Sequence, residues 1–314
     1  MALAIRSLFN IILMRKILIY ILLVVLTACE TQSGIEIDGG GSSYILSSFI
    51  YPDSDVVVHL YKSVPYNDTV RMSYITENQT IKISVNKSKT YERVLNGGES
   101  SVSFGRIELS PYDNIEISTQ TPDNEQIKAE TSILPPPRID QVDTLMQSRR
   151  SRTKTLQLKI TFSDGADPNG YYQIVVKRRD VLPDGQNIIS EVSCNYADAV
   201  FNSDKTNLWG ASSIGLFSGK TFDKPIRIFV YGNNVFSPRS EGCEAYLDVY
   251  LFSHTYNYYL FAKAINNSTN NEMSIPNFVA PAIQSNVDGG YGIVSGMSYS
   301  RYSMPLDDYL IVTD

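Results

Sequence analysis

The chain has 314 residues, of which 27 are basic and 33 acidic, and its formal net charge is −6. This balance argues against a nucleic-acid binder, because such proteins gain affinity from basic groups that neutralise phosphates. Charged residues make up only 19% and tyrosines number 21, which is typical of a β-rich exported protein rather than a helical cytosolic enzyme.

The N-terminal segment has the layout of a secretory signal peptide. Arg15 and Lys16 precede an apolar run over residues 17–26, and this run is too short for a membrane-spanning helix, which needs about 20 apolar residues. A basic start, a short apolar core and small residues at the end are typical of a cleaved leader. We expect residues 1–28 to be this leader, starting at the first residue or at Met14.

Cys29 is the predicted attachment point of a membrane anchor. Residues 26–29, Leu-Thr-Ala-Cys, resemble the lipobox of bacterial lipoproteins, in which the cysteine is acylated and becomes the first residue. Two or three acyl chains anchor a protein stably, whereas one holds it only marginally. The alternative is an ordinary apolar cysteine inside a leader. The leader contains three of the basic residues, so the mature chain has 24 basic and 33 acidic residues, a net charge of −9.

A tether and a first β domain are predicted after the anchor. Residues 29–43 end in the sequence SGIEIDGGGSS, which is typical of a flexible tether. Residues 44–134 show period-two alternation and turn sequences, which predict an Ig-like antiparallel β-sandwich. The apolar positions of three of its strands are Ile81, Ile83 and Val85; Ile115, Ile117 and Thr119; and Ile127, Ala129, Thr131 and Ile133.

The sequence LPPP at residues 134–137 marks the predicted domain boundary, because proline cannot donate to a β-ladder and favours a stiff, extended chain. Residues 135–314 form a second β-rich domain, a sandwich or a partly closed barrel. Its alternating apolar positions are Leu156, Leu158, Ile160 and Phe162; Ile226, Ile228 and Val230; and Leu247, Val249 and Leu251.

One short helix is expected in the second domain. It is predicted from Ser253, as its N-cap, to Asn267. One side of this helix would present four side chains: Tyr256, Tyr259, Leu260 and Lys263.

Three segments of the sequence together resemble a known family. They are AETSILPPPRIDQVD (129–143), LDVYLFSHTYNYYLFAKA (247–264) and PAIQSNVDGGYGIVSGMS (281–298). In this order and spacing they are similar to the Bacteroidota lipoprotein family labelled domain of unknown function 4249, over nearly the whole mature chain. The resemblance implies a cell-envelope lipoprotein, often encoded beside a TonB-dependent outer-membrane receptor. It implies no catalytic residues.

The expected location is the outer membrane, with the chain held there by its N-terminal lipid. Exported lipoproteins of these bacteria usually carry an acidic cluster directly after the cysteine, whereas here only Glu30 precedes the sequence TQSG. A surface-exposed and a periplasm-facing orientation therefore stay open.

Two cysteines remain after lipidation, Cys194 and Cys243. An oxidising compartment would allow them to pair as a disulfide. Two separately buried thiols are the alternative.

The sequence contains no constellation that identifies a reaction, a cofactor or a metal. Its two histidines, His59 and His254, are not spaced as a metal-binding pair, and there is no Cys-x-x-Cys motif. The segment GASSIG at residues 210–215 does not place a serine between glycines as a nucleophile elbow does. We therefore expect a protein that is not an enzyme and has no cofactor, although carboxylates from distant strands would suit a hydrolase.

Two weaker features are candidate sites. Asp164, Asp167 and Asn169 offer the oxygen ligands that calcium prefers, but the same residues are typical of a tight turn. Thr69 and Thr144 each lie between an aspartate and an apolar residue, a pattern that resembles the O-glycosylation motif of Bacteroidota. A threonine in a strand needs no such role.

Two functions of different classes follow. The first is a non-catalytic accessory lipoprotein that captures or delivers the ligand of a TonB-dependent transporter. The second is a free-standing glycan-binding or adhesive surface lipoprotein, in which exposed tyrosines such as those of MSYSRYSMP (297–305) are stacking platforms. Half-buried strand packing is the alternative role of those tyrosines. A hydrolase with carboxylates at the rim of the sandwich is the third option.

Overall fold

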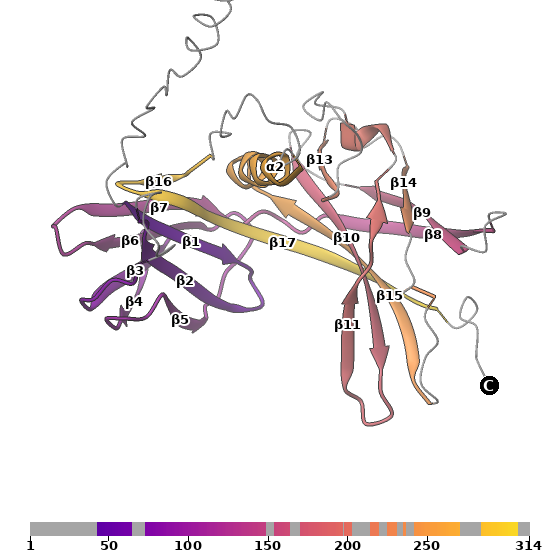
Figure 1. Cartoon of the computed structure of the whole chain (residues 1–314), viewed down its shortest axis with the longest axis horizontal. Coiled ribbons are helices and arrows are strands. Elements are labelled where there is room, and N and C mark those ends of the chain that lie inside the picture. Colours follow the sequence, from indigo (N-terminus) through magenta and orange to yellow (C-terminus); the bar gives the residue numbers. More distant parts are fainter. Residues whose placement is uncertain are drawn as a thin grey trace, which may run out of the picture. The chain divides into compact units, whose positions relative to one another are not determined.

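The structure is a computed structural model, and it confirms the mostly β fold (Figure 1). It describes residues 43–64, 73–148, 154–163, 170–196, 198–202, 214–219, 225–230, 235–236, 242–270 and 284–306. Several sheets are present, and one of them is curled like half a barrel.

The first unit is a β-sandwich whose strands alternate as the sequence predicts. One layer contains β1 (Tyr44–Ile50), β2 (Asp55–Lys62) and β5 (Ser101–Arg106). The other layer has the order β16-β7-β6-β3-β4, with β3 (Gln79–Val85), β4 (Lys89–Leu95), β6 (Asn114–Gln120), β7 (Gln126–Ser132) and β16 (Val287–Asp288). The predicted apolar positions of β3, β6 and β7 are all buried, and they pack between the layers.

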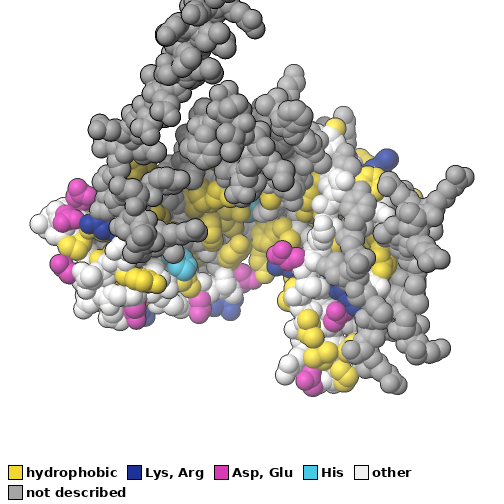
Figure 2. All heavy atoms as spheres, viewed as in Figure 1, with side chains coloured by type: hydrophobic (Ala, Val, Ile, Leu, Met, Phe, Trp, Pro, Cys, Tyr) yellow, Lys and Arg dark blue, Asp and Glu magenta, His cyan; other side chains and the backbone are white. Residues whose placement is uncertain are grey.

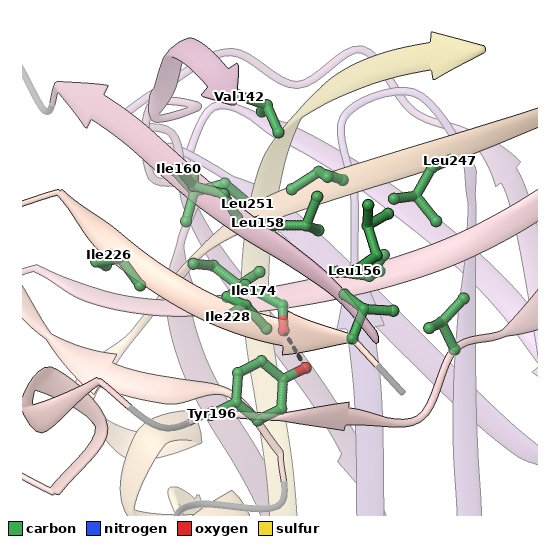
Figure 3. Close-up of a cluster of buried hydrophobic side chains, with 14 of the residues drawn as sticks. Val142, Leu156, Leu158, Ile160, Ile174, Tyr196, Ile226, Ile228, Leu247 and Leu251 are labelled. Atoms are coloured by element: carbon green, nitrogen blue, oxygen red, sulfur yellow. Dashed lines mark hydrogen bonds between the residues drawn. The ribbon is translucent and has the colours of Figure 1, made fainter. Parts of the chain in front are cut away.

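The second unit packs one further sheet and the rest of the eight-stranded sheet, which continues from β1, β2 and β5, around its own apolar core, which Figure 3 shows. One sheet has the order β12-β14-β9-β8, with β8 (Arg138–Ser148), β9 (Lys154–Ser163), β12 (Cys194–Asn195) and β14 (Ile226–Val230). The other contains β10 (Tyr171–Val181), β11 (Asn187–Glu191), β13 (Leu216–Ser218), β15 (Glu244–His254) and β17 (Tyr291–Pro305). Every predicted apolar position of β9, β14 and β15 is buried in this core.

Strand β17 belongs to both units (Figure 1). Its first half pairs with β1, and its second half pairs with β15 in antiparallel register. The β1–β17 pairing is parallel, so the first sandwich is not antiparallel throughout. Gly292 makes this pairing feasible, since its φ is +127° and a Cβ there would collide with the Leu46 carbonyl oxygen.

The proline segment connects β7, which ends at Ser132, to β8, which begins at Arg138. The predicted domains 44–134 and 135–314 stay a prediction. Residues 287–296 belong to the second predicted domain, but they pair with β7 and β1, which are strands of the first unit.

The helix begins later than the sequence predicts. Helix α2 runs from Tyr256 to Asn270, and its cap is Thr255, whose hydroxyl oxygen accepts from the Tyr258 amide at 3.4 Å. Ser253 was the wrong cap, because it is buried inside β15 and pairs there with Tyr172 and Ser298 on the neighbouring strands. The described residues also include a 3-10 helix, η1 (Ala199–Asn202).

Within the described ranges, no helix has the length and apolar character needed to cross a membrane.

Candidate functional site

The second face of the large sheet carries aromatic and charged side chains. On β15, alternate residues from Ala245 to Leu251 enter the core of the second unit. The residues between them face the other way, because successive side chains of a strand point to opposite sides. These residues are Tyr246, Asp248, Tyr250 and Phe252. Figure 2 shows hydrophobic side chains gathered below α2 over β17 and β15, with acidic and basic side chains beside them.

Four rings on this face form a continuous set, which we call the aromatic strip: Tyr51, Tyr250, Phe252 and Tyr299. Ring centroids lie 6.1 Å apart between Tyr250 and Phe252, 5.4 Å between Phe252 and Tyr299, and 6.2 Å between Tyr299 and Tyr51. All four are half-buried and belong to neither apolar core. Rings held by one another and partly open to water are typical of a preformed contact surface.

Next to the aromatic strip lies a charged cluster of Asp248, Arg179 and Arg301, which come from three neighbouring strands. Asp248 is 1% exposed, and its Oδ2 accepts from Arg179 Nε and from Arg301 Nη2, each at 2.9 Å. Burial raises the pKa of Asp248, but hydrogen bonds from Arg179, Ser303 and Arg301 more than offset this, so the pKa lies below its ordinary value. Asp248 is therefore a buried carboxylate that holds two arginines in place.

The remaining contacts of Arg179 fix its position. Its guanidinium lies 4.4 Å from the Tyr246 ring centroid, and its Nη2 donates to Ser303 Oγ at 3.1 Å. The hydroxyl of Tyr246 donates to Glu244 at 2.6 Å. Arg179 is thus fully engaged, and Arg301 is the arginine of the cluster that reaches solvent, with 38% of its side chain exposed.

Two cations, Lys177 and Arg301, lie near the Tyr250 ring, and we call them the cation pair. Lys177 Nζ lies 5.8 Å and the Arg301 guanidinium carbon 5.9 Å from the centroid of the Tyr250 ring. Within the described part of the chain, Lys177 makes no ion pair. This arrangement places positive charge over a ring on an otherwise acidic protein.

A cleft of about 240 Å³ opens beside Tyr299 at the end of the aromatic strip. Its walls are mostly apolar, and it is lined by Pro52, Asp53, Pro111, Ile133, Leu134, Pro136, Ser298 and Tyr299. The Tyr299 hydroxyl donates to Asp53 Oδ2 at 3.1 Å. Burial first, and then the charge of Asp53, raise the pKa of Tyr299, so this hydroxyl stays protonated as a donor.

Helix α2 covers the other end of the face. His254 lies with its ring 4.2 Å from Tyr258 and 5.9 Å from Phe252, centroid to centroid. Its Nε2 is 3.1 Å from Gln173 Oε1, while its Nδ1 has no partner among the described residues. Burial lowers the pKa of His254 to about 3. His254 is a neutral packing residue, and His59 lies exposed on β2.

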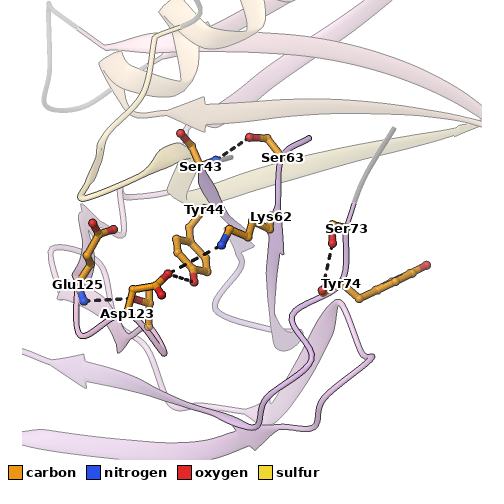
Figure 4. Close-up of polar contacts among 9 residues, drawn as sticks. Ser43, Tyr44, Lys62, Ser63, Ser73, Tyr74, Asp123 and Glu125 are labelled. Atoms are coloured by element: carbon orange, nitrogen blue, oxygen red, sulfur yellow. Dashed lines mark hydrogen bonds and ion pairs between the residues drawn. The ribbon is translucent and has the colours of Figure 1, made fainter. Parts of the chain in front are cut away.

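Figure 4 shows the polar contacts where the described chain begins, next to the predicted tether. The Tyr44 hydroxyl donates to Asp123 Oδ2 at 3.0 Å, and Lys62 Nζ lies 3.8 Å from the same oxygen. Lys62 Nζ also lies 5.0 Å from the Tyr44 ring centroid, and the Ser43 amide donates to Ser63 Oγ at 2.9 Å. These contacts fix the start of β1 to the sandwich.

The predicted site residues lie in different places. Cys29, Thr69, Asp164, Asp167 and Asn169 are outside the described residues, so anchor, calcium and first glycosylation site stay predictions. Thr144 is half-buried on β8, at the edge of its sheet. No group of three histidine, cysteine or acidic side chains in the described ranges is placed to hold a metal ion.

Both remaining cysteines are free thiols in this structure. Cys194 is half-buried and its Sγ donates to the Val192 carbonyl at 3.4 Å, whereas Cys243 is buried. Burial raises the pKa of Cys194 to about 12. The disulfide stays a prediction for oxidising conditions.

The tyrosines of residues 297–305 divide between two roles. Tyr299 lies in the aromatic strip, whereas Tyr302 packs against the core of the second unit. Asp248 and its two arginines were not among the site residues predicted from the sequence. The sequence did contain a signal for this cluster: Asp248 lies two residues from Tyr246 and two residues from Tyr250, on the polar face of a strand whose other face is apolar.

Two other hollows carry less chemistry. A groove of about 820 Å³ is lined by amide and hydroxyl side chains of β3, β6 and the following turns, with Glu77 and Lys82 as its charged groups. A hollow of about 290 Å³ on β8 and β9 includes Asp143, Thr144 and Arg227. Neither contains an aromatic ring.

The fold and this face define a mostly β protein with a preformed aromatic and charged surface on one sheet. The family model described as Domain of unknown function (DUF4249) matches residues 31–303, and the chain belongs to this family. This confirms the family label, domain of unknown function 4249, that the sequence resemblance gave. No curated protein matches the chain.

Proposed function

We propose that the protein is an outer-membrane lipoprotein that acts as a non-catalytic accessory of a TonB-dependent transporter. Its lipid at Cys29 would hold it at the membrane, and the aromatic strip would contact the ligand or the transporter. Residues 29–43 would let the folded body stand off the membrane.

The observation that supports this role best is the composition of the open sheet face. Half-buried aromatic rings and arginines are the residue types that contribute most to binding surfaces. The Asp248 network holds the arginines before any partner arrives, and such preorganisation lowers the entropic cost of binding.

Co-purification tests this proposal. The native lipoprotein, tagged at its C-terminus, is extracted from the outer membrane in mild detergent, and its partners are identified by mass spectrometry. We expect a near-stoichiometric β-barrel transporter with the wild type, and loss of this partner with Tyr250→Ala. A Tyr74→Ala variant is the matched control, because Tyr74 is 59% exposed and lies outside the aromatic strip. Purification of the wild type alone, while other transporter complexes stay intact, would refute the accessory role.

The second candidate is a free-standing glycan-binding lipoprotein. The aromatic strip favours it, because sugar rings pack their apolar faces on tyrosine and phenylalanine. A transporter gene directly beside this one would favour the accessory role, and an isolated gene would favour the free-standing one.

A further inference from the structure

The two side chains of the cation pair keep hydrogen-bond donors that no described residue of the chain accepts from. Arg301 uses its Nη2 for Asp248, and neither its Nε nor its Nη1 has a partner among the described residues. Lys177 contacts the Tyr250 ring and makes no ion pair in the described ranges. Two cations with free donors therefore flank one half-buried ring, which is a suitable place for the negative group of a ligand.

The charge around the aromatic strip differs between its centre and its ends. The centre contains Lys177, Arg179 and Arg301 against two carboxylates, that of Asp248 and that of Glu191, which lies opposite Lys177 in the pairing of β10 with β11. The two nearby carboxylates of the ends, Glu244 and Asp53, each accept a hydrogen bond from a tyrosine hydroxyl. A negative group thus meets net positive charge in the centre only.

The dimensions and chemistry suit an extended ligand. From Tyr246 to Phe252 the face covers six strand steps, about 20 Å at roughly 3.3 Å per residue. Along this length, the adjacent rings of Tyr250 and Phe252 lie beside the hydrogen-bonding groups of Asp248 and Arg179. A chain of sugars presents the same combination, with C–H faces for the rings and hydroxyls for the polar groups. The cation pair adds the requirement for a carboxylate.

We propose that this face binds an oligosaccharide that contains a uronic acid. One carboxylate lies between Lys177 and Arg301, and the ring that bears it packs on Tyr250. The next sugars follow Phe252 and Tyr299 toward the cleft beside Asp53. This inference rests on the proposal that the aromatic strip is the ligand-binding face, and it specifies the class of ligand.

Calorimetry with charged and neutral versions of one sugar chain tests this inference. The probes are tetramers of galacturonate, glucuronate and mannuronate and their methyl esters, titrated into the mature lipoprotein in mild detergent at low salt. Esterification removes the charge and leaves the sugar ring unchanged. We expect at least one acid tetramer to bind at least tenfold more tightly than its ester.

Four variants assign the effect to residues. Tyr250→Ala weakens binding of acid and ester alike, by tenfold or more. Lys177→Gln reduces the preference for the acid to less than threefold, and it leaves the Asp248 network intact because Lys177 is not part of it. Tyr74→Ala and Arg93→Gln, on the exposed surface of the first unit, are the matched controls and keep wild-type affinity.

Absence of binding to all three acid tetramers by the folded wild type overturns the inference. Equal affinity for acid and ester, or an unchanged preference in Lys177→Gln, also overturns it. The two proposals can fail separately. A transporter that co-purifies with the wild type but not with Tyr250→Ala, without any sugar binding, keeps the accessory role and makes the face a protein interface. Sugar binding without a transporter keeps only the ligand class.

Discussion

Asp248→Asn changes the charge of the buried carboxylate that organises the candidate site. The substitution keeps the side-chain volume, so no cavity forms and the change in the free energy of unfolding reports on charge and hydrogen bonding. Breaking a buried ion pair by changing one partner costs about 3–5 kcal/mol. Arg301 is 38% and Arg179 17% exposed, so water can compensate both cations in part. We therefore expect a loss at the lower end, about 3 kcal/mol.

Urea denaturation followed by circular dichroism measures this loss. Three kilocalories correspond to a fall in Tm of roughly 6–12 °C for a chain of this size. Asp143→Asn is the matched control, since its carboxylate lies 3.8 Å from Lys159 and both side chains are nearly half exposed. Such surface pairs contribute only about 0–1 kcal/mol. A loss below about 1 kcal/mol in Asp248→Asn, similar to that of the control, would show that Asp248 does not hold the arginines.

The same carboxylate predicts a pH dependence. Because the pKa of Asp248 is lower in the folded chain, its contribution to stability is present above the unfolded pKa near 3.9. The contribution disappears as the pH falls through the folded pKa. Wild type and Asp248→Asn should therefore become more similar in stability in acid, and a difference that grew in acid would contradict the assignment.

Three further predictions concern other residues. Burial lowers the pKa of His254 to about 3, so His254 stays neutral in the folded chain while the unfolded chain takes up a proton below pH 6.5. This difference should cost about 2 kcal/mol of stability at pH 5. His254→Gln should remove this part of the pH dependence of urea unfolding, and an unchanged pH dependence would refute the burial of a neutral His254. Gly292→Ala should destabilise the chain by more than about 2 kcal/mol, since the new Cβ meets the Leu46 carbonyl. The control Gly185→Ala, at φ +83° with no atom near its new Cβ, should cost only about 1 kcal/mol. Equal losses in the two variants would contradict the close approach of β1 and β17. Burial raises the pKa of Cys194 to about 12. Iodoacetamide at pH 8 should therefore alkylate Cys194 roughly a thousandfold more slowly in the reduced native chain than in the unfolded chain. Similar alkylation rates, measured by mass spectrometry, would refute the burial of this thiol.

The strands could be predicted because their signal is local. Ile81, Ile83 and Val85 alternate with polar neighbours, and this pattern alone requires one buried and one exposed face. The same reasoning holds for Leu156 to Phe162 on β9. Pairing partners are a different matter, because they depend on contacts between distant segments.

The parallel pairing of β1 and β17 joins Ile45 to Tyr291 and could not be read from either segment. The start of the helix was predicted wrongly because it also depends on contacts between distant segments. Ser253 and Thr255 are both suitable N-caps by residue type, and the ladder with Tyr172 and Ser298 decides that Ser253 stays in the strand.

The candidate site was predicted only in part. Tyr299 was among the tyrosines expected to act as platforms, because aromatic residues were visible in the sequence. The charged cluster was not, since Arg179, Asp248 and Arg301 come from three strands separated by long stretches of chain. Only the register of β10, β15 and β17 brings them together.

Photo-crosslinking from the aromatic strip tests most directly whether this face is the binding site. Tyr250→p-benzoylphenylalanine is introduced into the full-length lipoprotein, the cells are irradiated, and crosslinked products are identified by mass spectrometry. We expect a crosslink to an outer-membrane β-barrel transporter, or to the carbohydrate that it carries, and no such product from the same substitution at Tyr74. Equal products from both positions, or none from Tyr250 in cells where the protein is folded and lipidated, would contradict the assignment of this face as the binding site.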